Sequence, residues 1–441
     1  MGKYCPGGGV VKFESAACFV FFSIFVSSAY ASSGRITLRE NIYLNQQPSP
    51  VPQSDSEVIL QYESKTPLSN NWLFQFQPDV RMFEAPQPNT FAADFNGRNT
   101  YLKARTNDLY LEFGSFIKEW EGTDGINPMD IATIKTYRDP INAESLGSWG
   151  IAAKSRGSSA WSWEVFYVPW QTPAIMPLSY SGWWPRNTAS LPLTQNNVTA
   201  LLPGEINYGI HSPQILNHAD ENNIGARLQF HGYSWDAALA GFQGQSQIPF
   251  FRPTLQGSVV ETSPIQVIQL TNPVNMQPVE YLRRTVSALF DYNLNPWIFR
   301  ISGRYDQPIG ADPLMPGWSE QFVGGVERTV TISDKTVIFS LQYAAGVMPS
   351  YPESFLNLSD PFQNALTWGI RYPLSDNLLL VYSGLNDFQY HSYYDSLKLE
   401  DSIGEHLAVS LVAELIGGAP DSLFGMWQNQ SCGYLTATYG F

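Results

Sequence analysis

The chain has 441 residues, a formal net charge of -14 and a mean hydropathy of -0.17. The acidic balance excludes a surface of clustered Lys and Arg, so no nucleic-acid partner is expected, and the low hydropathy excludes a bundle of membrane helices. Aromatic residues make up 14% of the chain, and charged residues, at 15%, fall below the roughly 25% usual for soluble domains. This composition is typical of a β-barrel that is apolar outside and polar inside.

Residues 1–31 have the features of a secretory signal peptide. Positive residues precede an apolar run over residues 16–26, and the small-x-small pattern of a cleavage site follows at residues 29–31. The apolar run is shorter than the ~20 residues that a membrane-spanning helix needs. We therefore expect an exported protein in which residues 1–31 are removed and residues 32–441 form a single domain.

Apolar and polar residues alternate along most of the chain from residue 58 onward, and no convincing amphipathic helix is present. A period of two predicts β-strands, because successive side chains of a strand point to opposite faces. The strands read from this pattern include those at residues 58–62, 72–76, 102–104, 109–113, 149–153, 161–167, 224–230, 286–292, 297–305, 322–330, 337–343, 366–372, 378–382, 407–415 and 433–441.

Two classes of connection alternate between these strands. Tight turns, such as residues 294–295 and 333–334, are followed by long connections, such as residues 119–148, 169–221 and 388–405. This regularity is typical of outer-membrane barrels, which have short periplasmic turns and long external loops.

The alternation also gives a strand count. If both termini lie in the periplasm, one extra strand is needed at residues 36–44 and another at residues 423–427, which makes 18 strands; without these two the count is 16. The predicted fold class is therefore all-β, a closed antiparallel transmembrane β-barrel of about 18 strands, with 16 strands as the next choice.

The last strand carries a resemblance to a known family. Phe441, Tyr439, Ala437 and Leu435 share one face. This ending resembles the C-terminal strand of Gram-negative outer-membrane β-barrels, in which the terminal Phe and the alternate apolar residues before it are read by the barrel-assembly machinery. The resemblance implies that Tyr439 and Phe441 form an assembly signal. It also implies the bacterial outer membrane as location, with membrane lipid and the assembly machinery as partners.

The strand faces opposite the apolar ones carry charged residues. If the apolar faces meet lipid, these faces line a lumen, and a barrel of 16 to 18 strands is wide enough to hold a water channel. The arginines favour an anionic solute, and the acidic residues among them weaken that preference. The alternative is the solvent face of a soluble sheet, which alternates equally well. The candidate lumen-lining and solute-binding residues are Lys103, Arg105, Glu112, Lys154, Arg227, Arg300, Arg304, Glu327 and Arg371.

A loop motif carries a second resemblance. Glu119-Trp120, followed by the Asp-Gly-Ile-Asn-Pro-Met-Asp run at residues 124–130, is similar to a segment in a group of outer-membrane barrels related in outline to alginate-export-type barrels. The stretches at residues 167–170 and 175–177 also resemble that group. Asp-Gly and Asn-Pro form turns, so this loop can fold compactly into the pore mouth or form a stiff surface turn.

The connection after residue 167 is rich in aromatic residues and Pro. Aromatic rings can stack on sugars and apolar chains, or they can simply pack the loop onto the barrel rim. With the loop motif, this connection gives the candidate pore-mouth residues Trp120, Asp124, Asn127, Asp130, Trp170, Trp183 and Trp184.

Enzymatic motifs are missing from the sequence. None of the five His has metal-ligand spacing, and no nucleophile elbow, phosphate-binding loop or dinucleotide fingerprint is present. Cys432 is the one cysteine outside residues 1–31, which leaves no internal disulfide. No enzyme, cofactor or metal is predicted.

The predicted function is an outer-membrane channel, or porin, through which small polar solutes diffuse, with a preference for anions. The first alternative is a transporter of hydrophobic compounds or polysaccharide. The others are a non-transporting surface barrel that acts as an adhesin or scaffold, and a secreted soluble β-sandwich that binds carbohydrate. A homo-oligomer is left open, because no residue pattern marks a subunit interface.

Overall fold

The structure is a computed structural model of the whole chain. It describes residues 32–45, 47, 53–84, 91–156, 160–177, 181–183, 194–195, 198–201, 208–210, 214–254, 256–262, 266–270, 274–310, 317–347, 362–419 and 422–441. The predicted signal peptide at residues 1–31 lies outside these ranges.

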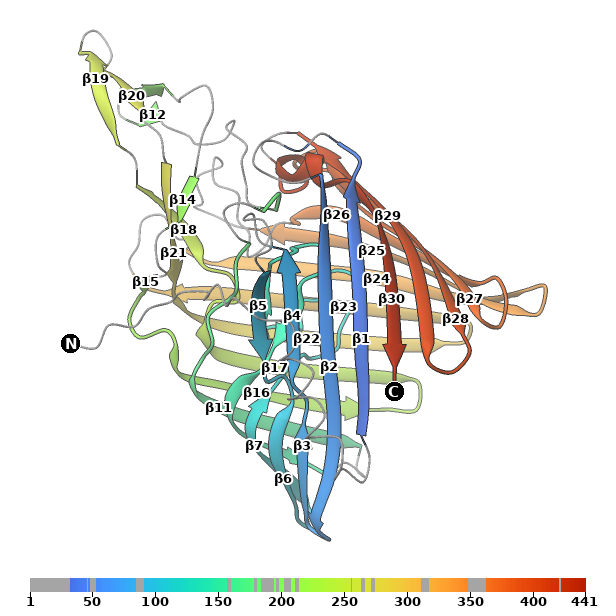
Figure 1. Cartoon of the computed structure of the whole chain (residues 1–441). Helices are drawn as coiled ribbons and strands as arrows, with labels where there is room; N and C mark the ends of the chain where they lie inside the picture. Colours follow the sequence, from blue (N-terminus) through green and yellow to red (C-terminus); the bar gives the residue numbers. More distant parts are fainter. Residues whose placement is uncertain are drawn as a thin grey trace.

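Eighteen antiparallel strands form one closed barrel, as predicted (Figure 1). The 20 strands of the main sheet make 18 crossings, because β3 with β4 and β5 with β6 are each one interrupted crossing. The crossings are β1 (Ser32–Tyr43), β2 (Ser54–Ser69), β3 (Trp72–Phe76) with β4 (Asp79–Glu84), β5 (Phe91–Asn96) with β6 (Thr100–Arg105), β7 (Leu109–Phe116), β10 (Ser148–Ser155), β11 (Trp161–Trp170), β16 (Glu221–His231), β17 (Trp235–Gln245), β22 (Leu282–Leu294), β23 (Trp297–Ile309), β24 (Ser319–Ile332), β25 (Lys335–Val347), β26 (Asn364–Pro373), β27 (Leu378–Asp387), β28 (Ser392–Ile403), β29 (Leu407–Gly418) and β30 (Cys432–Gly440).

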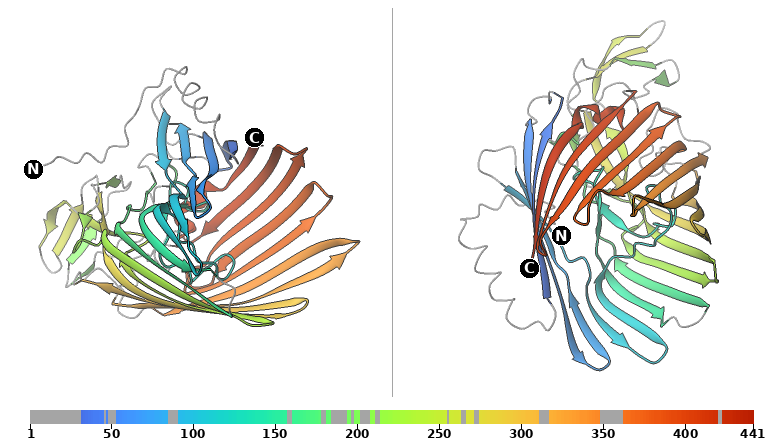
Figure 2. Two further views of the ribbon diagram at one scale, coloured as in Figure 1. Left: turned by 90° about the horizontal axis from the view of Figure 1, so that it is seen from below. Right: turned by 90° about the vertical axis from the view of Figure 1, so that its right-hand side faces the viewer.

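The barrel closes where its first and last strands meet. β1 pairs with β2 on one side and with β30 on the other, so no edge strand of the wall is left open (Figure 2). The turns at one end are tight. Between β24 and β25, for example, Ser333 and Asp334 both have positive φ, which matches the twist of a two-residue hairpin.

The predictions for two segments are wrong, although the predicted strand count is right. Residues 423–427 do not form a strand; they lead into a short 3₁₀ helix, η1 (Gly425–Gln430). Residues 388–405, predicted as a long connection, contain the barrel strand β28. The acidic residues of β28 made it look like a loop, whereas the apolar residues before β30 pack inside the barrel instead of crossing a membrane.

The remaining strands lie in the long connections at the other end of the barrel. A small pair sits in the connection after β7, and two small sheets are built from the connections after β11 and β17 (Figure 1). These strands are β8 (Ile134–Thr136), β9 (Glu144–Leu146), β12 (Thr194–Gln195), β13 (Val198–Leu201), β14 (Tyr208–Ile210), β15 (Gln214–Ile215), β18 (Phe250–Thr254), β19 (Gly257–Glu261), β20 (Gln266–Leu270) and β21 (Val274–Glu280).

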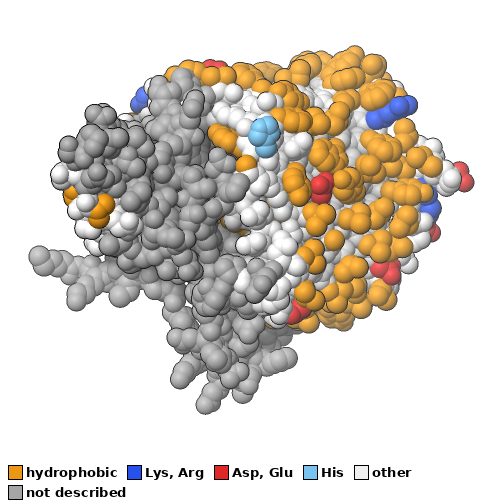
Figure 3. All heavy atoms as spheres, turned by 90° about the horizontal axis from the view of Figure 1, so that it is seen from above, with side chains coloured by type: hydrophobic (Ala, Val, Ile, Leu, Met, Phe, Trp, Pro, Cys, Tyr) orange, Lys and Arg blue, Asp and Glu red, His pale blue; other side chains and the backbone are white. Residues whose placement is uncertain are grey.

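The apolar faces of the strands point outward. On β23, the Ile301 side chain is 62% exposed, whereas the neighbouring Ser302 is 1% exposed and faces the interior. On the side shown in Figure 3, hydrophobic side chains cover much of the outer wall and charged ones are few. A soluble β-sandwich, one of the alternatives, is therefore wrong, because its apolar faces would be turned inward. No helix in the described ranges is long and apolar enough to cross a membrane.

Candidate functional site

The connection between β7 and β10, residues 117–147, folds into the interior of the barrel, and we call it the lumen loop. The side chains of Met129 and Ile131 in this loop are fully buried. They pack with Trp120 against inward-facing residues of the wall, among them Phe166 and Phe242. The interior is therefore partly filled by an apolar cluster, which the alternation of polar residues on the strands did not predict.

The Asp-Gly-x-Asn-Pro-x-Asp motif builds the turns of the lumen loop. Gly125 has a φ of +75°, which favours glycine, and the Ile126 amide donates a hydrogen bond to the Asp124 carbonyl. The Asn127 side chain accepts a hydrogen bond from the Met129 amide (3.0 Å) and donates one to the Trp120 carbonyl (2.9 Å). These local bonds hold the loop compact inside the barrel.

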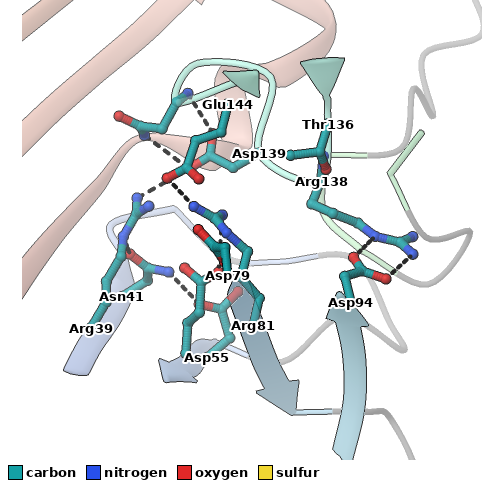
Figure 4. A network of polar contacts seen from close by, with 12 residues as sticks. Arg39, Asn41, Asp55, Asp79, Arg81, Asp94, Thr136, Arg138, Asp139 and Glu144 are labelled. Carbon is teal, nitrogen blue, oxygen red and sulfur yellow. Dashed lines mark hydrogen bonds and ion pairs between the residues drawn. The ribbon is translucent and has the colours of Figure 1, made fainter. Parts of the chain in front are cut away.

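Ion pairs fasten the lumen loop to the wall formed by β1, β2, β4 and β5 (Figure 4). Arg39 on β1 pairs with Asp139 of the loop at 3.0 Å, and Arg138 of the loop pairs with Asp94 on β5 at 2.9 Å. Arg81 on β4 pairs with Glu144. The side chains of Arg39 and Asp139 are mostly buried, so salt screens this pair less than a surface pair.

The opposite wall holds the loop in the same way. Arg300 pairs with Asp124 of the loop at 2.9 Å and with Glu327 of the wall at 3.2 Å. Arg283 pairs with Asp306 at 2.6 Å and donates a hydrogen bond to the Ile131 carbonyl of the loop. Of the predicted lumen residues, Arg300 and Glu327 therefore lie in ion pairs that position the loop, and Arg304 joins the Arg283 pair by contacting Asp306 at 2.6 Å.

A polar cavity of about 400 Å³ lies between the first residues of the lumen loop and the wall from β6 to β16. Three of the candidate lumen residues, Glu112, Lys154 and Arg227, line it, and Lys103 contacts Glu112 at 3.5 Å. Lys118, which the strand pattern could not reveal, contacts Glu112 at 3.0 Å. The cavity is thus lined by charges of both signs.

Three contacts from the lumen loop reach the glutamates on the wall of this cavity. Lys118 reaches Glu164 at 2.7 Å as well as Glu112, and the Trp120 indole N–H donates to Glu164 at 3.1 Å. Among the described residues, neither Lys154 nor Arg227 has a carboxylate within ion-pair distance. These two cationic side chains therefore lack a carboxylate partner, and Arg227 donates one hydrogen bond, to the Glu121 carbonyl at 3.5 Å.

An apolar cavity of about 520 Å³ lies on the other side of the lumen loop. It is enclosed by the loop, by the wall from β25 to β28 and by the segment before β30. Trp183 lines it and packs edge-on against Trp427, with ring centroids 5.9 Å apart. The Trp427 indole N–H donates to the Trp183 carbonyl at 2.9 Å. The aromatic residues before β30, predicted as a strand, therefore form a wall of this cavity.

The other predicted residues lie apart from both cavities. Arg105 and Arg371 are exposed at the tight-turn end of the barrel, the first beside the turn after β6 and the second near the end of β26. Trp170 does not lie in the pore mouth, because it is paired with Trp149 at the end of β11 and is 70% exposed. Trp184 lies outside the described residues.

The predicted assembly signal lies on the outer face and at the chain end. Tyr439 is exposed on the same face as Leu435. The backbone of Phe441 makes hydrogen bonds to Gly34 in both directions, at 2.9 and 3.0 Å. Within the described residues, no three His, Cys, Asp or Glu side chains gather in a way that could hold a metal ion.

Comparison with known proteins identified no matching family model and no matching curated protein. Among solved structures, OccAB3 of Acinetobacter baumannii is 11% identical, with 93% of this chain and 99% of that chain covered and a TM-score of 0.50. A BenF-like porin from Pseudomonas fluorescens Pf-5 is 10% identical, with 94% and 98% covered and a TM-score of 0.50.

A third solved structure is Wzi, an outer-membrane protein involved in group 1 capsule assembly in Escherichia coli and described as a carbohydrate-binding β-barrel. It is 11% identical, with 96% of this chain and 87% of that chain covered and a TM-score of 0.47. At such identities, the likeness to OccAB3 and the BenF-like porin shows a shared closed β-barrel fold and nothing finer. The relation to alginate-export-type barrels stays a prediction.

Proposed function

We propose that this protein is an outer-membrane channel that passes small polar solutes, with a preference for anions. One observation carries the proposal: a closed barrel with an apolar outer face holds a polar cavity that is lined by charged residues beside the lumen loop. Water-filled interiors and lipid-facing apolar bands are typical of porins. The fold shared with the two solved structures that have a TM-score of 0.50, one of them a BenF-like porin, supports the same proposal.

The preference for anions follows from which charges are already paired. Lys103 and Lys118 together balance the charges of Glu112 and Glu164, whereas Lys154 and Arg227 have no ion pair among the described residues. Glu119 accepts a hydrogen bond from the Ser145 hydroxyl, and Glu121 is exposed. The cationic pair can therefore attract and orient an anionic solute as it passes the lumen loop.

Reversal potentials in a planar bilayer under a salt gradient test this proposal. The wild-type barrel should favour anions, and the double variant Lys154→Gln, Arg227→Gln should lose most of that preference. The matched control is Lys335→Gln, which removes a positive charge that pairs with Asp376 at a tight turn instead of in the lumen. A cation-selective wild type, or a double variant with unchanged selectivity, would refute the anion preference.

The predicted location and partners form part of the same proposal. The protein would be exported with residues 1–31 removed and inserted in a Gram-negative outer membrane. The barrel-assembly machinery would read Tyr439 and Phe441, and lipid would cover the apolar outer face. The solute-binding roles of Lys103, Arg105 and Arg371 would be minor compared with those of Lys154 and Arg227, because only the latter two line the polar cavity without an ion pair.

A second candidate function is transport of hydrophobic compounds. The apolar cavity inside the barrel is the observation that favours it, because a polar solute would gain little there.

A further inference from the structure

The apolar cavity is a built site with fixed walls. Phe424 stacks on Phe362 and on Tyr394, with ring centroids 5.6 and 5.9 Å apart. The Trp183–Trp427 pair closes another side. Because the rings support one another, the cavity keeps its shape without a ligand, and its volume of about 520 Å³ falls in the range typical of small-molecule sites.

The barrel wall leaves room for this cavity by using small residues. Ser340 on β25, Gly369 on β26 and Ser383 on β27 are cross-strand neighbours that line it. A Cβ atom at Gly369 would lie 2.7 Å from the Ser340 hydroxyl oxygen. A large side chain at any of these positions would fill the space that a ligand needs.

One polar group in the cavity has an unused hydrogen-bonding atom. Gln342 on β25 lines the cavity and is 5% exposed, and its Oε1 atom is buried and has no hydrogen-bond partner among the described residues. An unpaired buried acceptor is costly, so a ligand that donates a hydrogen bond would be favoured there. A small turn of the amide group toward the cavity would let Oε1 accept this bond and form the polar end of the site.

The charges around the cavity discriminate against anions. Among the described residues, no Lys, Arg or His lines it. Its one lining carboxylate, Asp124, already pairs with Arg300. A carboxylate ligand would lose its hydration without gaining a cation, whereas a neutral ligand would not.

We propose that this cavity binds an uncharged compound of two or three fused rings that carries a hydroxyl group. The rings pack between Phe424, Trp183 and the small residues of the wall, and the hydroxyl donates a hydrogen bond to Gln342 Oε1. The inference rests on the second candidate function in one respect, because the solute must reach the cavity through the lumen. It differs from the anion preference, which belongs to the polar cavity on the other side of the lumen loop.

The probe is a fluorinated naphthylmethanol, titrated against the barrel in lipid nanodiscs and followed by fluorine NMR, with empty nanodiscs as the baseline for lipid partitioning. Wild type should bind it saturably. Ser383→Leu, which fills the cavity, should weaken binding at least about tenfold, and Gln342→Leu, which keeps the volume, about two- to tenfold. The corresponding naphthoate should bind at least about tenfold more weakly than the alcohol.

Ser162→Leu is the matched control, because Ser162 lines the polar cavity and the substitution is the same. It should leave binding of the alcohol unchanged, and heat-modifiable gel migration should show that every variant is folded. Non-saturable binding, equal affinity in Ser383→Leu, or a tighter naphthoate would overturn the inference. Conductance of the same preparations separates the two proposals: a conducting barrel that does not bind the alcohol refutes only this inference, and a silent barrel that binds it refutes only the channel.

Discussion

At the scale of single residues, Trp120 connects the lumen loop to the wall in two ways. Its ring lies 5.9 Å from that of Phe166, and its indole N–H donates to Glu164. It is 2% exposed, so its packing is nearly complete. The sequence motif indicated that this Trp begins the loop, but it could not reveal the partners, which come from β11.

Replacing this residue should loosen the loop. Trp120→Ala removes the packed ring and should destabilise the docked loop by about 3 to 5 kcal/mol. Hydrogen exchange across residues 117–147 should become much faster, while exchange in the wall strands stays slow. Trp120→Phe keeps a ring but loses the N–H donor. Its loop should exchange faster than that of wild type and more slowly than that of Trp120→Ala. Unchanged exchange in the Ala variant would show that the loop does not depend on this contact.

Glu280, which lies outside the membrane-spanning strands, is expected to make the stability of its surroundings depend on pH. Burial raises the pKa of Glu280, at the end of β21, from 4.5 to about 7. The folded protein therefore keeps this proton at pH values where the unfolded chain has lost it. The stability linked to Glu280 is fully present at pH values below the pKa of this group in the unfolded chain. It is lost as the pH rises through the pKa of the group in the folded protein.

The amides of Leu216 and Ser246 report on this region, because they bond to the carbonyls of Glu280 and Tyr281 at 2.9 and 2.8 Å. Their hydrogen-exchange protection, corrected for the intrinsic rate, should be higher at about pH 5 than at about pH 8. Glu280→Gln fixes the neutral form and should remove the difference. Protection that is independent of pH in the wild type would contradict the shifted pKa.

At the scale of elements, periodicity predicted the strands whose apolar residues meet the outside, and it failed where other forces dominate. In β28, Leu397 and Leu399 alternate with Lys398 and Glu400 as in any other wall strand. The nearby acidic residues hid this pattern. The segment that leads into η1 is apolar because it packs in the interior, and periodicity cannot distinguish that packing from a membrane crossing.

The ion pairs between the lumen loop and the wall are expected to limit movement of the loop. Arg39→Gln leaves Asp139 without its partner on β1, which should weaken docking by about 1 to 3 kcal/mol for a partly buried pair. Single-channel recordings should show more frequent current fluctuations than in wild type. Arg35→Gln is the control, because Arg35 is an exposed residue of the same strand. Equal fluctuations in the two variants would mean that this ion pair does not hold the loop.

One small residue lies where the chain end meets β1. A Cβ atom at Gly34 would overlap the ring of Phe441, so Gly34→Val should displace the terminal ring from its place against β1. The fraction of assembled, heat-modifiable barrel in outer-membrane preparations should fall. Gly324→Val is the control, because a Cβ atom there meets nothing within 4 Å. Similar losses in both variants would argue against a role for the terminal ring.

At the scale of the whole molecule, the sequence predicted the wall better than the interior. Strand parity placed Lys154, Arg227 and Arg300 on the inner face, because a period of two fixes the side on which a side chain lies. It could not pair Arg39 with Asp139, 100 residues apart, or place Trp183 beside Trp427. Those contacts depend on how long connections return into the barrel, which local patterns do not encode.

The two cavities on either side of the lumen loop give the molecule a divided interior. The polar cavity lies near the strands that follow β5, and the apolar cavity lies against β25 to β28. Under the two proposed functions, a solute would be sorted by its charge as it meets the loop. This division depends on the loop remaining docked between them.

Single-channel conductance of the purified wild-type barrel in a planar bilayer tests the channel most directly. Discrete, reproducible current steps are expected, because a channel that passes small polar solutes also passes hydrated ions. Heat-modifiable migration of the same sample establishes that it is folded. A folded barrel that inserts into the bilayer but passes no current would contradict the proposed channel function.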